Sequence, residues 1–154
     1  MYLLLDSAHN GITAKGQLRT QPGHLIDIMA TCLAITGVNY PSHYNGNEIQ
    51  PYEGVSLLPA FTNKNLKREW LFWEHEGNRA LRVGNWKIVS RVQKNKGFTR
   101  TDETAWELYD LEKDPTEQHN LAAETKYSKL VEEMKKSLLK ERIKYQDTDK
   151  AGVL

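Results

Sequence analysis

The stretch Trp106–Ala122, which reads WELYDLEKDPTEQHNLA, decides how the second half of the chain folds. Residues 106–111 alternate between two faces, and this period of two is typical of a β-strand. One face has Trp106, Leu108 and Asp110, and the other has Glu107, Tyr109 and Leu111. Pro115 has no N–H to donate to the hydrogen-bond ladder of a sheet, so it ends the strand. We expect the acidic residues beside it to stay solvated. Leu121 then returns towards the core before a last helix begins. The stretch therefore predicts a strand-to-helix corner.

Further strands are expected upstream of this corner. Residues 69–74 and 80–92 are rich in Trp, Phe, Leu and Val, and polar EGN and GN steps between or within them permit tight reversals. These segments predict antiparallel strands.

The segment after the corner is dense in Lys and Glu but carries an apolar stripe at helical spacing. The stripe consists of Tyr127, Leu130, Val131, Met134, Leu138 and Tyr145. A long amphipathic helix should lie across the sheet, because neither element can bury its apolar face alone. We therefore expect an α+β fold, in which a small antiparallel sheet of three to four strands is packed by a long C-terminal amphipathic helix.

The first part of the chain has different patterns. Apolar residues over 23–37 mostly follow helical spacing, and Gly37 supplies the stop. Residues 38–63 follow neither period and predict a long surface connection that ends near 57–59 and has room for one short helical turn. The single cysteine, Cys32, excludes an internal disulfide and a multi-cysteine zinc site, and we expect it to be a buried apolar residue.

Bulk composition narrows the classes of partner. Among 154 residues, 21 Lys plus Arg balance 20 Asp plus Glu, so the net charge of +1 gives no general reason to expect nucleic acid or an anionic membrane. The opening MYLLLDS holds only a short apolar run, so we expect no signal peptide and no spanning helix there.

The sequence offers little for a metal ion. Asp110, Glu112 and Asp114 lack the central glycine and later glutamate of a calcium-binding EF-hand loop. The five histidines are scattered, and none has a cysteine or second histidine at zinc spacing. We expect no metal site formed by this chain alone.

Four ordered stretches resemble the formylglycine-dependent sulfatases of the arylsulfatase superfamily. ELYDLEKDPTEQHNLA is similar to the ending of that family, in which an L-Y-D-L strand is followed by a D-P turn and an N-L-A step. PGHLIDIMATCLAITGV is similar to a family helix, GVSLLP to a G-x-S-L-x-P segment, and REWLFWEHEGNRALRVGNWKIV to a strand pair. The matches cover about residues 11 to 145.

The resemblance implies hydrolysis of sulfate esters, with a sulfated small molecule or sugar as substrate. Family members use a formylglycine made from a C/S-x-P-x-R motif and a calcium ion held by Asp and Asn. This chain contains no C/S-x-P-x-R, so we expect the C-terminal fragment of a sulfatase, inactive by itself. On this hypothesis, residues 1–63 are a remnant of the catalytic α/β domain and residues 64–154 are the C-terminal subdomain. Relatives are often periplasmic, secreted or lysosomal, which leaves the compartment of this chain open.

The hairpin sequence EHEGNRA is the candidate substrate site. In the resembling family this hairpin end faces the substrate cleft, which suggests substrate contact for His75, Asn78 and Arg79. A guanidinium with neighbouring donors suits an anionic or sugar ligand. The alternative is that these groups form only turn hydrogen bonds and a strand ion pair.

A noncatalytic carbohydrate-binding or assembly module is the competing hypothesis. Strand tryptophans could form a sugar platform, although tryptophans that face a covering helix are more often core. These are Trp70, Trp73, Trp86 and Trp106. If the chain is a fragment, the helix over 23–37 should be exposed and available for self-association. The apolar residues concerned are Leu25, Ile28, Met29 and Leu33.

Overall fold

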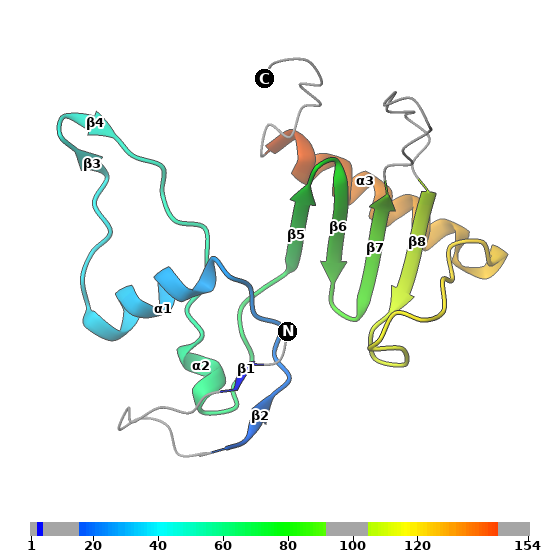
Figure 1. The fold of residues 1–154 in the computed structure, drawn as a ribbon, viewed down its shortest axis with the longest axis horizontal. Helices are drawn as coiled ribbons and strands as arrows, with labels where there is room; N and C mark the ends of the chain where they lie inside the picture. The colour runs from blue at the N-terminus through cyan, green and yellow to red at the C-terminus, as the bar shows by residue number, and fades with distance from the viewer. Residues whose placement is uncertain (1–2, 5–15, 92–104, 145–154) are drawn as a thin grey trace. The chain divides into compact units, whose positions relative to one another are not determined.

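The computed structural model of the chain describes residues 3–4, 16–91 and 105–144 (Figure 1). It forms two compact units, Met1–Arg68 and Glu69–Leu154, each with a hydrophobic cluster of its own. Among the described residues, no helix is both long enough and apolar enough to cross a membrane. The assignment of the first unit to a remnant catalytic domain stays a prediction.

The second unit is built on a four-stranded antiparallel meander in the order β5-β6-β7-β8. The strands are β5 (Trp70–His75), β6 (Asn78–Val83), β7 (Trp86–Arg91) and β8 (Ala105–Asp110). The predicted antiparallel sheet is confirmed. The segment predicted over 80–92 is divided between β6 and β7, because the chain reverses at Gly84, whose φ of 58° favours glycine.

The long helix α3 (Ser128–Lys144) lies across one face of this sheet, after the 3₁₀ turn η1 (Thr125–Tyr127) (Figure 1). Cross-strand register aligns Phe72, Leu81, Ile88 and Leu108 in one row beneath it. The helix contributes Val131, Met134 and Leu138 to the same core. Complete burial of a side chain of this size stabilises the fold by about 1.5–3 kcal/mol. The predicted α+β packing is confirmed, while Tyr145 lies outside the described residues.

The corner after β8 is held by a side chain whose role the sequence did not reveal. The Asn120 side chain accepts the Leu108 N–H at 3.0 Å and donates to the Trp106 carbonyl at 3.3 Å, so it satisfies the free edge of β8. Leu121 packs against the core, as predicted. The expectation of solvated acids is wrong for Asp114, whose side chain is 15% exposed and accepts the His119 N–H at 2.8 Å.

Among its described residues, the first unit contains one helix longer than a single turn, α1 (Asp27–Thr36). Gly37 ends it in the left-handed conformation at φ 70°, and its N–H donates to the Leu33 carbonyl, as the stop signal predicted. The remaining elements are short. They are β1 (Leu3–Leu4) paired with β2 (Leu18–Arg19), β3 (His43–Tyr44) paired with β4 (Asn47–Glu48), and α2 (Leu58–Phe61). The predicted short helical turn is confirmed in α2, but the β3–β4 hairpin was not predicted.

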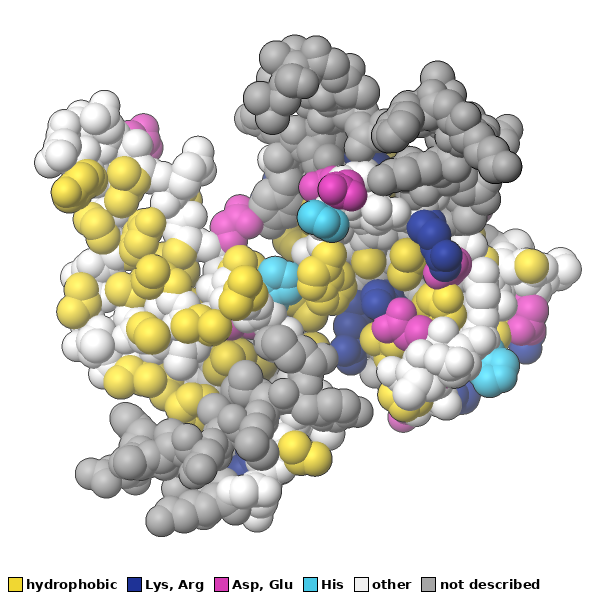
Figure 2. All heavy atoms as spheres, in the orientation of Figure 1, with side chains coloured by type: hydrophobic (Ala, Val, Ile, Leu, Met, Phe, Trp, Pro, Cys, Tyr) yellow, Lys and Arg dark blue, Asp and Glu magenta, His cyan; other side chains and the backbone are white. Residues whose placement is uncertain are grey.

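Helix α1 buries its polar side. Its buried residues are Asp27, Ala30 and Thr31, whereas Leu25 before the helix and Ile28 and Met29 within it are 73%, 55% and 53% exposed. Hydrophobic side chains are spread over the described surface of this unit (Figure 2). The predicted exposure is confirmed for these three residues, while Leu33 is half-buried.

The prediction that Cys32 is buried is wrong, because its side chain is exposed. The buried positions of α1 at 27, 30 and 31 follow i, i+3, i+4 spacing. Cys32 lies next to this stripe and points away from it, which accounts for its exposure.

Gly54 allows the chain to pass closely over the start of α1. A Cβ atom built on Gly54 would lie 2.1 Å from the Ile26 carbonyl oxygen, which is backbone and cannot rotate away. The residues that follow bind α1: the Val55 N–H donates to Asp27 and the Leu57 N–H donates to Thr31. The close approach at Gly54 therefore sets the position of this whole segment.

Replacement of Gly54 by alanine is expected to destabilise the first unit by about 2–3 kcal/mol, because the backbone must move and strain the hydrogen bonds that follow. Hydrogen exchange at the amides of Val55 and Leu57 would report the loss. The matched control is Gly46→Ala. The new Cβ there meets no atom within 4 Å, so only the positive φ of 80° disfavours alanine. Equal exchange rates in wild type and Gly54→Ala would contradict the steric argument.

Candidate functional site

The candidate site is the hairpin end that joins β5 to β6. His75 and Asn78 form the last cross-strand pair, with Glu76 and Gly77 between them. Both turn residues have positive φ, 51° and 83°, as in the type I′ turns that match the twist of a two-residue hairpin. Gly77 accepts this conformation freely, whereas Glu76 is strained there.

Side chains on both sides of the turn hold its backbone. The Gly77 N–H donates to the Glu74 carboxylate at 2.8 Å, and the Arg79 guanidinium donates to the Gly77 carbonyl at 3.0 Å. The Asn78 amide donates to the His75 carbonyl at 3.2 Å. The alternative interpretation, with turn hydrogen bonds, therefore accounts for contacts of Asn78 and Arg79.

The three predicted site residues come together at this hairpin end but differ in exposure. The His75 side chain is exposed, Asn78 is half-buried, and Arg79 is 7% exposed. Strand alternation places His75 and Trp73 on the face of β5 opposite to Phe72, which packs under α3. His75 is thus the most accessible of the three for a ligand, and whether any of them touches a substrate stays a prediction.

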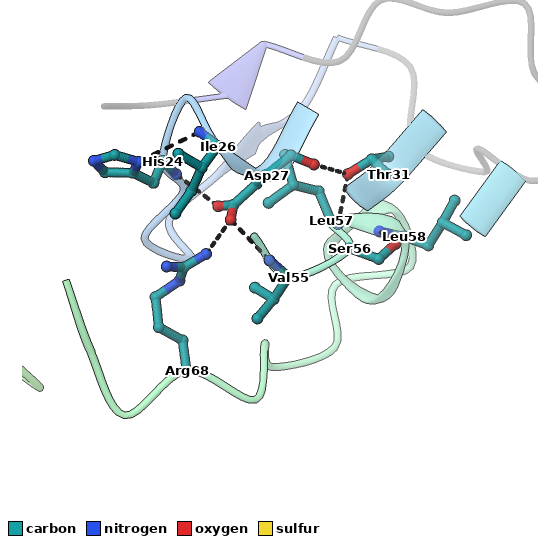
Figure 3. A network of polar contacts seen from close by, with 9 residues as sticks. All are labelled: His24, Ile26, Asp27, Thr31, Val55, Ser56, Leu57, Leu58 and Arg68. Carbon is teal, nitrogen blue, oxygen red and sulfur yellow. Dashed lines mark hydrogen bonds and ion pairs between the residues drawn. The ribbon is translucent and has the colours of Figure 1, made fainter. Parts of the chain in front are cut away.

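A second polar cluster surrounds the buried carboxylate of Asp27 in the first unit (Figure 3). Asp27 is 0% exposed and accepts the His24 N–H at 2.7 Å and the Val55 N–H at 3.0 Å. It also forms an ion pair with Arg68, whose side chain is 8% exposed. The carboxylate therefore joins three segments of the unit, and its contacts are structural.

His24 lies beside this ion pair. Burial lowers the pKa of His24, Arg68 lowers it further, and the Asp27 carboxylate opposes both effects. Its Nδ1 atom accepts the Ile26 N–H at 3.4 Å (Figure 3). A neutral imidazole fits this arrangement because only the unprotonated nitrogen can accept.

No group of three or more His, Cys, Asp or Glu residues suited to a metal ion occurs within residues 3–4, 16–91 and 105–144. The calcium ion implied by the resemblance therefore finds no ligand set in the described part of this chain. Formylglycine likewise has no precursor here, since the sequence lacks C/S-x-P-x-R.

The chain matches a known protein family over most of its length. The family model described as N-sulphoglucosamine sulphohydrolase, C-terminal, matches residues 9–144, which is most of the chain. The chain belongs to this sulfatase family. The predicted relation to the C-terminal portion of a sulfatase is confirmed.

Individual sulfatases agree with this assignment. Arylsulfatase K of Xenopus laevis is 30% identical over 151 residues, covering 90% of this chain and 26% of that protein. N-acetylglucosamine-6-O-sulfatase of Bacteroides thetaiotaomicron is 27% identical over 129 residues, covering 80% of this chain and 22% of that protein. A solved structure of a protein in complex with its substrate D-glucosamine-2-N,6-O-disulfate shares the fold, with a TM-score of 0.55 and 24% identity over 80% of this chain and 24% of that one.

The chain spans about a quarter of the length of these curated relatives. The shared region includes the candidate hairpin and the Asp27 cluster, since both lie within residues 9–144.

The sheet face opposite to α3 carries polar contacts that sequence reasoning missed. Lys87 lies 5.9 Å from the Trp73 ring centroid and forms an ion pair with Glu117 at 2.7 Å. On the same face, burial and a hydrogen bond to Glu107 raise the pKa of Tyr109 to about 12. The interpretation of the tryptophans as core residues is confirmed for Trp70, Trp86 and Trp106, which pack against the core under α3. Trp73 instead lies on the sheet face opposite to α3. Cross-strand register was the missing information.

Proposed function

We propose that this chain acts as the C-terminal subdomain of a sulfuric ester hydrolase, and that the end of the β5–β6 hairpin lines its substrate cleft. The substrate class is a sulfated sugar. One relative is named as an N-acetylglucosamine-6-O-sulfatase, and one structural neighbour is in complex with D-glucosamine-2-N,6-O-disulfate. The observation that carries the proposal is the exposed His75 imidazole at the tip of a turn held by polar contacts.

The chemistry of this hairpin end suits such a substrate. An imidazole and an amide can donate to sulfate or hydroxyl oxygens, and a guanidinium adds positive charge. In our proposal, His75 and Asn78 contact the sugar sulfate. Arg79 lies beneath them and acts mainly through charge, because it is buried and one of its nitrogens already donates to Gly77.

A titration with D-glucosamine-2-N,6-O-disulfate, followed by NMR, tests this proposal. The ring protons of His75 should shift as the weakly bound sugar is added. His75→Ala, read from the backbone amides of the hairpin, should weaken binding about twentyfold, because one hydrogen bond to a charged group is worth about 1.5–3 kcal/mol.

The matched control for this titration is His119→Ala. His119 is another exposed histidine of the same unit, placed in the corner after β8, the edge strand on the other side of the sheet from β5. Equal weakening in both variants, or no shift at His75, would contradict the proposed contact.

We further propose that the chain supplies scaffold and substrate contacts but no nucleophile. Sulfate ester cleavage in the resembling family needs formylglycine, and the 154 residues contain no motif from which it could be made. The purified chain, mixed with a chromogenic aryl sulfate and calcium, should therefore release no more chromophore than a buffer blank. Turnover that scales with chain concentration and survives repurification would refute this part.

Assembly with a second chain is the other candidate function. It is favoured by the exposed apolar residues Leu25, Ile28 and Met29 at and before α1. Exposed apolar side chains raise the free energy of the chain in water, and their burial on association lowers it.

If the chain assembles in this way, sedimentation velocity should show a fraction of dimer that increases with chain concentration. The double variant Ile28→Glu/Met29→Glu should abolish this dimer. The matched control is Ile143→Glu on α3, since Ile143 is 78% exposed and belongs to the other unit. A monomer at every concentration, or equal loss in both variants, would exclude association through α1.

A further inference from the structure

We propose that Glu74 is a positioning residue for sulfated-sugar binding: its carboxylate, together with Arg79, holds the backbone of Gly77 so that the His75 side chain is presented in one orientation. This inference rests on the proposed function of the hairpin end. It adds a residue that itself does not touch the substrate.

Gly77 is bound at both of its polar backbone atoms. Glu74 accepts its N–H at 2.8 Å, and Arg79 donates to its carbonyl at 3.0 Å. Glu74 and Arg79 are direct cross-strand partners, so the two side chains reach the turn from adjacent positions. Gly77 itself is buried although it lies in a two-residue turn.

These two contacts hold a turn that its own sequence does not favour. Glu76 has φ 51°, a region that side chains other than Asn, Asp and Gly rarely adopt. Strained backbone of this kind persists only where surrounding contacts hold it, and it is found at ligand sites. The carboxylate of an exposed Glu74 loses rotational freedom to make the contact, so the hydrogen bond must offset an entropic cost.

The bracing and presenting residues lie on opposite faces of the hairpin. Glu74 and Arg79 have the strand parity of Phe72 and Leu81, which pack under α3. His75 and Asn78 have the opposite parity, and Asn78 also donates to the His75 carbonyl. Glu74 can therefore be altered without removal of a group that would meet the sugar.

The test compares Glu74→Ala with Glu74→Gln in the full chain, with D-glucosamine-2-N,6-O-disulfate as the probe. Glu74→Ala removes the acceptor of the Gly77 N–H, so the Kd read from the His75 ring protons should rise about tenfold and the Gly77 amide should exchange faster. Glu74→Gln keeps an acceptor oxygen at the same place, so its Kd should stay within about twofold of wild type.

The outcomes separate this inference from the function on which it rests. A role in stability alone would lower the melting temperature of Glu74→Ala but leave the Kd of the folded chain unchanged, and that result overturns the positioning role while the proposed function stands. Failure of glutamine to rescue binding overturns it as well. If the His75 ring protons of the wild-type chain do not shift when the probe is added, both the proposed function and this inference are overturned.

Discussion

The packing of α3 against one row of the sheet is the interaction on which the second unit depends. Leu81, Ile88 and Leu108 are aligned by strand register and are almost completely buried under Leu138 and its neighbours on the helix. Because side chains alternate along a strand, this one contact determines the face to which every other strand residue belongs. It places Trp73 and the Tyr109 hydroxyl on the opposite face, and it is the reason that the hairpin end has two chemically different sides.

The first unit depends on a different kind of contact. Its helix α1 buries a carboxylate, a methyl and a hydroxyl group, and leaves Ile28, Met29 and Ile35 exposed. Removal of one partner from a buried ion pair such as Asp27–Arg68 leaves an unpaired charge and typically costs 3–5 kcal/mol, so the polar face is held inside by necessity. The cost of this arrangement is the exposure of Ile28 and Met29 to water.

The sequence predicted the second unit better than the first for a physical reason. Period-two strands, a glycine-containing turn and an apolar helical stripe are local patterns, and one core satisfies them all. In the first unit the apolar stripe over 23–37 correctly predicted a helix, but the buried face could not be predicted from it. The burial of Asp27 depends on donors from Val55 and Arg68, which lie far along the chain.

The candidate site shows the same limit at smaller scale. The EHEGNRA stretch makes His75 and Asn78 the last cross-strand pair, with Arg79 next in the strand, because a two-residue turn makes its neighbours adjacent. Their different exposures follow from cross-strand register and could not be deduced from residue type. The role of Asn120 at the edge of β8 was missed for a related reason, since an asparagine in a loop sequence carries no mark of the strand whose N–H and carbonyl it will satisfy.

A hairpin that presents a ligand contact has to be rigid beyond the end of its core. The α3 packing holds Phe72 and Leu81, but the turn lies several residues further on, where apolar burial ends and the Glu76 side chain is exposed. At that distance only directional contacts can restrict the backbone, and hydrogen bonds to the N–H and the carbonyl of Gly77 supply them. Precise placement of a contact group matters because a change remote from the chemistry can cost about a hundredfold in rate when it misplaces the reacting groups by about 1 Å. On our proposal, a subdomain that supplies contacts but no nucleophile can therefore still influence how fast a sulfate ester is cleaved, provided that its polar turn is held as firmly as its apolar core.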